Sequence, residues 1–231
     1  MARHLAIGDI HGCVSALRLL LEFVAPADDD IVITLGDYVD RGPDSRGVID
    51  LLIDLGQTCR HVALRGNHEI MMLDARDKKS WLHPWLRYGG EATLRSYGLS
   101  ADTAGSFEDI PDAHIDFLEN RLLPYYECET HFFVHAYADA GTALDNQSDA
   151  NLYWRKYSTS EAHCSGKIMV CGHTPQRSGL PVVDEHAICI DTRAFDAGWL
   201  SCLDVEAEKV FQANEAGEKR SFSLEEVESL R

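Results

Sequence analysis

Eight polar residues of types that bind metals or transfer protons follow directly after apolar, strand-like stretches. They are carboxylates, imidazoles and one amide: Asp9, His11, Asp37, Asp40, Asn67, His68, His135 and His173. The densest group lies at residues 36–42, where two carboxylates, an arginine and two glycines occupy seven positions. Two acids three residues apart are costly to bury without a cation beside them. Taken alone, this stretch could also be an acidic turn that caps the next helix, so its partners elsewhere in the chain decide its role.

The residue types in this set favour a metal site. Asp9 and His11 have the period-two spacing that puts both side chains on one side of an extended segment, where they can bind one ion. Asp37 can bridge two ions with its two oxygens, and Asn67 and further imidazoles can complete a second site. Mixed nitrogen and oxygen ligands without a thiolate suit manganese, iron or zinc better than calcium. The other histidines are expected to be hydrogen-bonded core or surface residues: His4, His61, His83, His114, His131, His163 and His186.

Strands and helices alternate in the first part of the chain, which would bring these residues together. Short apolar runs at residues 4–7, 31–35 and 61–64 predict strands, and each leads into a glycine-containing polar loop. Leucine and valine at helical spacing follow at residues 14–24 and 45–55. Repeated strand–loop–helix units are typical of an α/β sheet that binds its ligands beyond the carboxyl ends of the strands.

The rest of the chain is expected to contain helices first and strands later. The segment 70–126 is helical in outline, with Trp81 and Trp85 as packing residues. Strands are predicted at residues 130–134, 168–171, 187–190, 199–205 and 209–212, the last two as a hairpin. The charged tail is compatible with a short helix that has a weak apolar edge. We therefore expect one domain over residues 1–213 and a charged C-terminal tail over residues 214–231.

The amino-acid composition and net charge limit the kinds of molecule that this protein is expected to bind. The net charge of −17 argues against nucleic-acid binding, because no net basic field is available to neutralise phosphates. No signal peptide is evident at the N-terminus, and no apolar run is long enough to cross a membrane. Seven scattered cysteines without a CxxC pair argue for reduced thiols rather than a disulfide framework. We expect a cytoplasmic protein with no nucleic-acid and no membrane partner; the oligomeric state is left open.

Three sequence blocks resemble the signature blocks of the calcineurin-like metallophosphoesterases. They are Gly8-Asp9-Ile10-His11-Gly12, Gly36-Asp37-Tyr38-Val39-Asp40-Arg41-Gly42 and Gly66-Asn67-His68-Glu69. The second block is similar to the GDxVDRG form of the phosphoprotein phosphatase branch, and His135 and Gly172-His173 are similar to its last two metal-binding blocks. The stretch from Trp85 through Gly89-Gly90 to Thr93-Leu94-Arg95-Ser96-Tyr97-Gly98 also resembles small bacterial serine/threonine phosphatases. Five blocks in this order make the resemblance specific.

The resemblance implies a four-layer α/β/β/α sandwich of two mixed sheets with flanking helices, and two divalent metal ions at the sheet edges. Manganese is the expected metal, with iron or zinc as alternatives. The implied ligands are Asp9, His11 and Asp37 for the first ion, and Asp37, Asn67, His135 and His173 for the second. The implied roles of the other residues are general acid for His68 paired with Asp40, and phosphate binding for Arg41 and Arg155.

The expected activity is hydrolysis of a phosphomonoester, in the first place a phosphorylated serine or threonine in a protein or peptide. Two divalent ions roughly 3.5–4 Å apart would activate a bridging hydroxide for in-line attack, so no phosphoenzyme is expected. The positive charge of the two metal ions exceeds the combined negative charge of Asp9, Asp37 and the hydroxide. The pocket would therefore be cationic although the protein is acidic. His68, oriented by Asp40, would protonate the leaving oxygen.

Two other functions are compatible with the sequence. Symmetrical dinucleoside polyphosphate hydrolases are similar to this sequence in the same blocks. Such an enzyme would be expected to have additional aromatic or basic residues that contact adenine and the extra phosphates. No basic cluster is evident, which favours the phosphoprotein substrate. A metal-binding scaffold with an inactive site is disfavoured, because His68, Asp40 and all expected ligands are present.

Three further residues have open roles. Tyr137 and Arg193 stand where similar proteins often have glycine. Tyr137 would change the wall beside the substrate, and Arg193 would either contact phosphate or peptide or pair with nearby acids. Cys13 follows the first block directly, so its exposure decides whether it is sensitive to oxidation.

Overall fold

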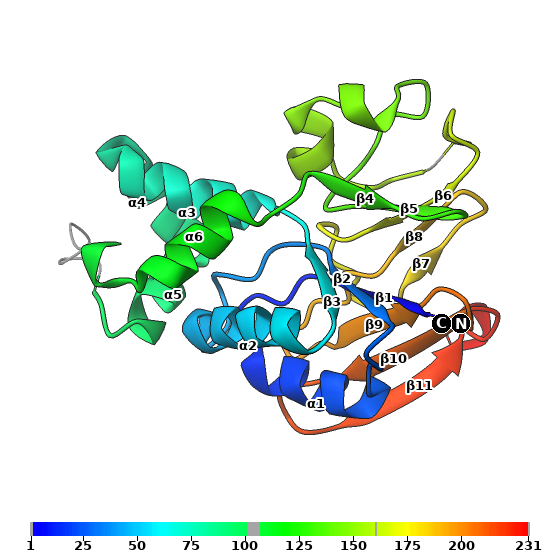
Figure 1. Cartoon of the computed structure of the whole chain (residues 1–231), viewed down its shortest axis with the longest axis horizontal. Helices are drawn as coiled ribbons and strands as arrows, with labels where there is room; N and C mark the ends of the chain where they lie inside the picture. The colour runs from blue at the N-terminus through cyan, green and yellow to red at the C-terminus, as the bar shows by residue number, and fades with distance from the viewer. Residues whose placement is uncertain (1, 101–106, 160, 231) are drawn as a thin grey trace.

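The computed structural model describes residues 2–100, 107–159 and 161–230. Two β-sheets lie face to face, with a group of helices projecting to one side (Figure 1). The first sheet has the order β11-β10-β9-β1-β2-β3. Its strands are β1 (His4–Ile7), β2 (Ile31–Thr34), β3 (Arg60–Ala63), β9 (Leu200–Asp204), β10 (Lys209–Ala213) and β11 (Lys219–Ser223). Strands β1, β2 and β3 are parallel, and β9, β10 and β11 are added in antiparallel fashion.

The second sheet has the order β4-β5-β6-β8-β7. Its strands are β4 (Tyr125–Glu127), β5 (His131–Val134), β6 (Ile168–Cys171), β7 (Val182–Val183) and β8 (Ala187–Cys189). The three central strands are parallel, and β4 and β7 are antiparallel edge strands. Both sheets are therefore mixed. The edge strands β4 and β7 were not expected from the sequence.

Alternation of side chains along the strands builds the layers. In β1, Leu5 and Ile7 pack with helices α1 (Val14–Val24) and α2 (Ser45–Thr58), whereas Ala6 faces the second sheet. In β5, Phe133 faces the first sheet, and Phe132 packs on the opposite side. This is the period of two that a strand imposes, and it lets each sheet bury both faces.

The outer face of the second sheet is covered by residues 137–157. This segment contributes Tyr137, Leu144 and Leu152 to the outer core through a 3-10 turn and one turn of π-helix. The expected four-layer sandwich of two mixed sheets is thus confirmed, and its fourth layer consists of short helices rather than long ones.

Four helices form a lobe beside the sheets, seen at the left of Figure 1. They are α3 (Asn67–Asp77), α4 (Lys79–Trp85), α5 (Glu91–Ser96) and α6 (Asp112–Asn120). The expected helical character of this region is confirmed, except that Tyr125–Glu127 form β4 and residues 101–106 lie outside the described residues. Trp85 is fully buried as expected, but the packing prediction is wrong for Trp81, whose exposed fraction is 45%.

The C-terminal tail belongs to the first sheet. Strand β11 pairs with β10 over its whole length, with Phe222 opposite Val210, so the idea of a helix there is wrong for these residues. Phe222 alternates with polar residues and enters the core between the sheets, together with Val227. Because β10 would otherwise expose unpaired backbone groups, β11 completes the sheet, and residue 213 is no structural boundary.

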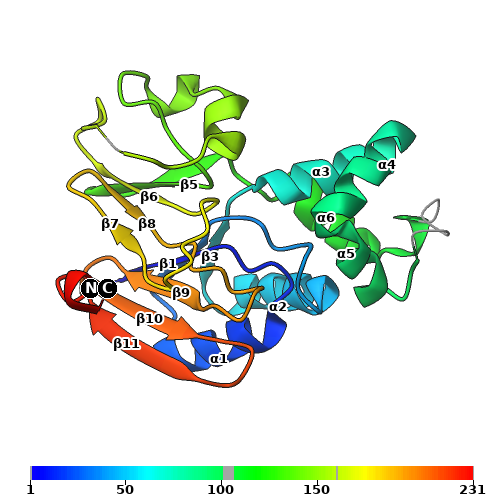
Figure 2. The same cartoon turned by 180° about the vertical axis from the view of Figure 1, so that it is seen from behind.

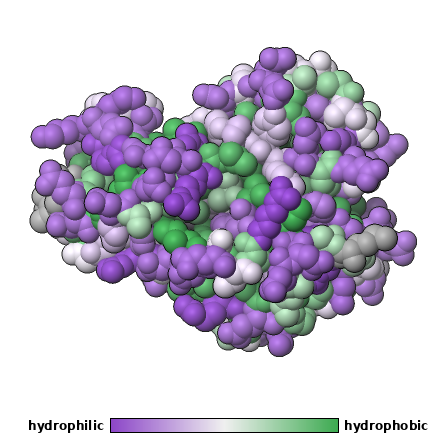
Figure 3. Space-filling model, viewed as in Figure 1, coloured by the Kyte–Doolittle hydropathy of each residue, from purple (hydrophilic) through white to green (hydrophobic). Residues whose placement is uncertain are grey.

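The surface of the molecule is mostly polar. Hydrophilic side chains cover most of the face shown in Figure 3, and hydrophobic ones appear chiefly near its middle. Within the described ranges, no helix has both the length and the apolar character needed to cross a membrane.

Candidate active site

The site forms where parallel strands end. Strands β1 and β2 run in register up to Ile7 and Thr34, so the loops after them lie side by side. The backbone N–H of His11 donates to the Asp37 carbonyl at 2.7 Å and ties the two loops together. The same arrangement in the second sheet joins the loops after β5 and β6, where the Gly172 N–H donates to the His135 carbonyl at 2.8 Å. The view from behind shows these loops meeting between the sheets and the helices (Figure 2).

Several site residues have a backbone conformation that L-amino acids rarely adopt. Positive φ angles occur at His11 (45°), Asp37 (52°), Asp40 (73°), Arg41 (69°) and His173 (61°). Each such residue costs on the order of 1–3 kcal/mol and persists only where its surroundings fix it, most often at functional sites. Five of the positive-φ residues therefore belong to the predicted site, whereas Asp9, Asn67, His68 and His135 have ordinary backbone conformations.

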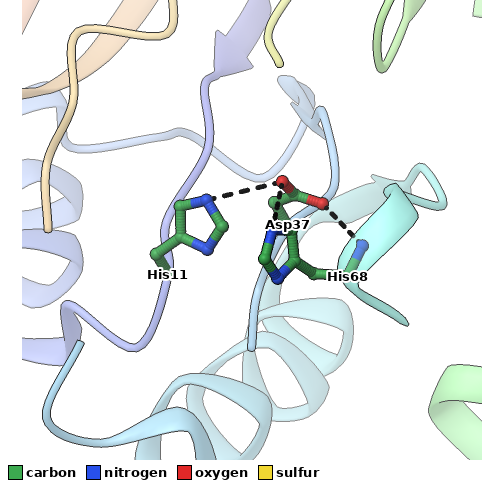
Figure 4. Close-up of side chains that lie close together, drawn as sticks. All are labelled: His11, Asp37 and His68. Carbon is green, nitrogen blue, oxygen red and sulfur yellow. Dashed lines mark hydrogen bonds and ion pairs between the residues drawn. The ribbon is translucent and has the colours of Figure 1, made fainter. Parts of the chain in front are cut away.

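Asp37 lies at the centre of the cluster. Figure 4 shows the rings of His11 and His68 beside its carboxylate. The nearest carboxylate oxygen is 3.4 Å from His11 Nε2, 3.4 Å from His135 Nε2 and 3.8 Å from His68 Nε2. Burial raises the pKa of Asp37, but the imidazoles of His135, His68, His11 and His173 outweigh burial and lower it well below its usual range. Asp37 is thus an ionised carboxylate that offers both oxygens.

The hydrogen bonds of the histidine ring nitrogens show that this cluster is suited to binding cations. His11 Nδ1–H donates to the Val39 carbonyl at 2.9 Å, and His135 Nδ1–H donates to the Leu35 carbonyl at 2.8 Å. In both rings the lone pair is therefore on Nε2, and in His135 it lies 3.0 Å from the Asn67 amide oxygen. Lone pairs and oxygens that face one another are satisfied by a cation between them, and backbone carbonyls that fix the tautomer are typical of metal-ligating histidines.

Two groups of candidate ligands share Asp37. One contains His11, Asp37 and His68, and the other contains Asp37, His135 and His173; within each group the ligand atoms lie within 4.8 Å of one another. His173 Nε2–H donates to the Trp154 carbonyl at 3.2 Å, which leaves Nδ1 available to a metal. A carboxylate shared by two groups is the arrangement that a dinuclear centre requires.

Asp9 lies at the end of β1 but does not belong to either of these groups. The His173 backbone N–H donates to its two oxygens at 3.1 and 3.0 Å. Burial, and then the negative charges of Asp191 and Asp37, raise the pKa of Asp9 well above its usual range. A cation beside Asp9 would offset this cost.

Asp191 is a buried neighbour that the sequence analysis did not assign to the site. Burial raises its pKa to about 7. The available signal was its position two residues beyond β8, the same strand-end placement as the other site residues.

His68 and Asp40 form a buried pair. His68 Nδ1 lies 2.6 Å from Asp40 Oδ2, and the same carboxylate accepts hydrogen bonds from the Trp85 indole N–H at 2.9 Å and the Thr93 hydroxyl at 2.7 Å. Burial lowers the pKa of His68, but Asp37 and Asp40 raise it more, so the net shift is upward. The carboxylates of Asp37 and Asp40 thus favour the protonated form of His68.

Glu69 is a positioning residue that holds the backbone of the two neighbouring loops. It belongs to the third sequence block, but the sequence alone assigned it no role. Its carboxylate accepts the backbone N–H groups of Asp37 at 2.9 Å, Tyr38 at 2.8 Å and Gly66 at 2.9 Å. Burial, and then Asp37, raise its pKa to about 7. Glu69 joins the second and third sequence blocks, and its place three residues after the helix-capping Gly66 was the available signal.

The two predicted phosphate-binding arginines lie in different surroundings. Arg41 lines the pocket, and its guanidinium lies over the Phe195 ring. Its Nη1–H donates to His11 Nε2 at 2.7 Å, so a metal ion bound by this nitrogen would take the place of that hydrogen bond. Arg155 stacks on Tyr137 at 4.0 Å and lies 3.9 Å from Asp139. Lys156, rather than Arg155, is among the residues that line the pocket.

The two remaining open residues have local explanations. Arg193 forms an ion pair with Asp196 at 2.5 Å, which agrees with pairing to a nearby acid. Cys13 is fully buried, and burial raises the pKa of its thiol to about 12. A protonated, inaccessible thiol is a poor target for oxidation.

A cavity of about 470 Å³ opens onto this cluster. Its lining includes the polar residues Asp37, Asn67 and His68 and the aromatic residues Trp81, Tyr88 and Trp154. The arrangement combines possible metal ligands, a proton donor and a cationic side chain in one pocket. Groups of these kinds act together in metal-assisted hydrolysis of phosphate esters.

Comparison with known proteins identifies the family. Residues 2–189 match the model of the calcineurin-like phosphoesterases. The chain belongs to this family. The phosphoesterase is similar to a protein named serine/threonine-protein phosphatase 1 from Salmonella typhimurium, at 34% identity over 218 residues that cover 88% of this chain and 93% of the relative. It is therefore a metal-dependent phosphoric ester hydrolase, of a family that uses two metal ions.

Other similar proteins bear the name of a nucleotide hydrolase. A symmetrical bis(5'-nucleosyl)-tetraphosphatase from Burkholderia pseudomallei is 32% identical over 125 residues, which cover 53% of this phosphoesterase and 38% of that relative. A solved structure described as a candidate diadenosine tetraphosphatase has a TM-score of 0.66 at 23% identity, over 96% of this chain and 93% of that one. The structural likeness supports the fold alone.

Proposed function

We propose that this phosphoesterase is a serine/threonine protein phosphatase that hydrolyses phosphomonoesters in proteins or peptides. The observation that carries the proposal is the buried His68–Asp40 pair facing Asp37 in the pocket, because this pair supplies the proton that an alkoxide leaving group needs. The choice of substrate rests on similarity over nearly the full length of a protein phosphatase, compared with 38% of the length of the nucleotide hydrolase.

Two divalent ions, expected to be manganese, would be held by the predicted ligands. Those ligands are Asp9, His11 and Asp37 for the first ion, and Asp37, Asn67, His135 and His173 for the second. When bound, such ions lower the pKa of water to supply a nucleophile and neutralise negative charge on phosphate. Iron and zinc are compatible with the same nitrogen and oxygen donors.

The protein's own side chains would bind the phosphate, orient the substrate and protonate the leaving group. Arg41 presents a guanidinium to the phosphate oxygens from the wall of the pocket. His68 Nδ1 is held by Asp40, so the proton that reaches the leaving oxygen comes from Nε2. In the proposed reaction no side chain accepts the phosphoryl group. Arg155 as a second phosphate-binding residue stays a prediction, since its guanidinium lies on Tyr137.

A symmetrical dinucleoside polyphosphate hydrolase is the second candidate. The observation that favours it is the aromatic wall of the pocket, formed by Trp81, Tyr88 and Trp154, together with Lys156. Aromatic side chains can stack on adenine, and a second cation can bind additional phosphates.

The test compares both substrates in one assay. Metal-free protein is reconstituted with manganese and given a serine- or threonine-phosphopeptide and, in parallel, diadenosine tetraphosphate. A much higher kcat/KM on the phosphopeptide, lost in the His68→Asn variant, would support the proposal. Preference for the dinucleotide would support the second candidate. Absence of turnover of either substrate with metals bound would contradict both.

A further inference from the structure

Arg41 is held by contacts at both ends of its side chain. At the backbone, its N–H donates to the Gly89 carbonyl at 3.2 Å. Gly89 has a φ of 114°, and a Cβ there would lie 2.7 Å from the Arg41 nitrogen and 2.8 Å from its Cγ, so this close approach depends on glycine. At the other end, the guanidinium carbon lies 4.7 Å from the centre of the Phe195 ring. The helical lobe thus fixes the base of this side chain, and an aromatic ring fixes its tip.

Phe195 lies behind Arg41 rather than in the pocket. Its half-buried ring packs against the hydrophobic core that α1 and α2 share. It is also nearly perpendicular to the His11 ring, with 5.0 Å between the ring centres. Within the described part of the chain, Arg41 is among the residues that line the cavity and Phe195 is not. Phe195 can therefore act on a bound phosphate only through the side chains that it contacts.

The loop that follows β8 carries Phe195 and is closed on itself. At its base, the Trp199 N–H donates to the Thr192 carbonyl at 3.1 Å, and the Thr192 hydroxyl donates to the Trp199 carbonyl. Nearer its tip, Arg193 and Asp196 form an ion pair, and the Asp196 N–H donates to the Arg193 carbonyl at 3.2 Å. These bonds join the residues on both sides of Phe195, so the loop holds the ring in its place against Arg41.

Contact with an aromatic ring holds an arginine without occupying its hydrogen-bond donors. The attraction acts between the cation and the face of the ring, so it needs none of the N–H groups that bind phosphate. A carboxylate partner would instead occupy two of these donors. In Arg41 one donor is used by His11 Nε2 and would become available when that nitrogen binds a metal ion. The contact with Phe195 does not involve that nitrogen and would remain.

We propose that Phe195 is a positioning residue that holds the Arg41 guanidinium ready to bind the phosphate of the substrate. The inference rests on the proposed function, in which Arg41 binds phosphate, and it adds the residue that fixes Arg41. An unrestrained arginine loses conformational freedom when it binds a ligand, and restraint before binding lowers that entropy cost. Phe195 therefore raises the affinity of the pocket for phosphate without touching it.

A double-mutant cycle on the manganese-loaded protein tests this role, with inorganic phosphate as the probe and calorimetry as the measurement. Phe195→Leu removes the aromatic face and keeps an apolar side chain, and it is made both alone and together with Arg41→Ala. Alone, it should weaken phosphate binding by about 3- to 10-fold. In the Arg41→Ala background it should have no further effect. A loss of the same size in both backgrounds would overturn the inference, as would absence of phosphate binding by the wild-type protein.

Two further variants separate the ring contact from general damage to the fold. Phe195→Tyr keeps the aromatic face and should bind phosphate as tightly as the wild-type protein. Phe211→Leu is the matched control, because Phe211 in β10 is also half-buried, lies 4.9 Å from Lys209 Nζ and is outside the lining of the pocket. It should leave phosphate binding unchanged. Equal losses in Phe195→Leu and in either of these variants would contradict the proposed role.

Manganese binding separates a role toward Arg41 from a role toward the predicted metal ligand His11. The His11 ring contacts Phe195, but its Nδ1–H donates to the Val39 carbonyl at 2.9 Å, which fixes its orientation independently of Phe195. Phe195→Leu should therefore bind manganese as tightly as the wild-type protein in calorimetric titration. A loss of manganese affinity that matches the loss of phosphate affinity would assign Phe195 to the metal site and overturn the inference.

Steady-state kinetics distinguish this inference from the proposed function. On a serine phosphopeptide, Phe195→Leu should raise KM and leave kcat nearly unchanged, because the restraint acts on the bound and the reacting phosphate alike. Weaker phosphate binding in the variant, with no turnover of the peptide by either protein, would overturn the hydrolytic function and support the role of Phe195. Turnover by both proteins with the same KM would support hydrolysis and overturn the role of Phe195.

Discussion

Replacing Trp85 by Phe tests how the general acid pair is held. Trp85 is fully buried, and its indole N–H donates to the two Asp40 oxygens at 3.0 and 2.9 Å. Phe keeps an aromatic ring in the core but removes this donor and leaves a smaller side chain in its place. The Thr93 hydroxyl and the His68 ring remain as the side-chain partners of the buried carboxylate.

The size of the effect follows from the charge of Asp40. A hydrogen bond to a charged group is worth about 1.5–3 kcal/mol, and the smaller ring adds a cavity cost on the order of 1 kcal/mol. Burial raises the pKa of Asp40, and its hydrogen bonds oppose that rise, so the variant should raise this pKa further. The donor matters only while Asp40 is ionised. The loss in unfolding free energy should therefore be complete above the Asp40 pKa of both proteins and should shrink to the cavity cost below them.

Urea unfolding from pH 8 down to the most acidic pH at which both proteins still fold measures this loss, with a chelator present so that metal release does not contribute. Phe107→Leu is the matched control, because the Phe107 ring packs 5.7 Å from Trp85 and makes no hydrogen bond to Asp40. Its penalty should not depend on pH. A Trp85→Phe penalty that is the same at every pH would refute the assigned role of the indole.

Three further changes have defined outcomes. His68→Asn should lower kcat on alkyl phosphates by about 10²–10⁴-fold and much less on p-nitrophenyl phosphate, whose leaving group needs no proton; equal losses in steady-state kinetics would contradict the general acid role. Gly172→Ala places a Cβ 2.0 Å from Asp9 Oδ1, so calorimetric titration should show about 10–100-fold weaker binding of one metal ion and unchanged binding of the other. Asp30→Asn should lower the free energy of unfolding by about 1–2 kcal/mol at pH 7. Burial raises the pKa of Asp30, but hydrogen bonds from Arg3 and Ala27 lower it to about 2. The expected loss is kept small because Arg3 is partly exposed, which weakens the ion pair. Because the folded-state pKa is lowered, this stabilisation is present above pH 3.8 and disappears as the pH falls towards 2, which acid unfolding of both proteins would show.

Local sequence patterns determined the strands and the residues that follow them. Apolar runs of four or five residues specify buried parallel strands, and the polar residues after them must lie at the sheet edge because each chain segment turns there. This is why Asp9 and Asp37 could be predicted as neighbours although they are far apart in the chain, whereas the place of His135, which follows a strand of the other sheet, was implied by the family resemblance. The sequence blocks around them also identified the family.

Tertiary packing decided what no local pattern contains. Strand β11 is held by its pairing with β10 and by Phe222 in the core between the sheets, and its own residues are too few and too polar to predict it. Glu69 gains its role from the loop after β2, whose backbone N–H groups it accepts. Trp81 and Trp154 lie in one pocket only because the helical lobe and the cover of the second sheet meet beside the reacting centre. Periodicity along the chain reports which side chains are buried, but contacts between distant segments depend on how the layers pack, and that packing sets the shape of the pocket.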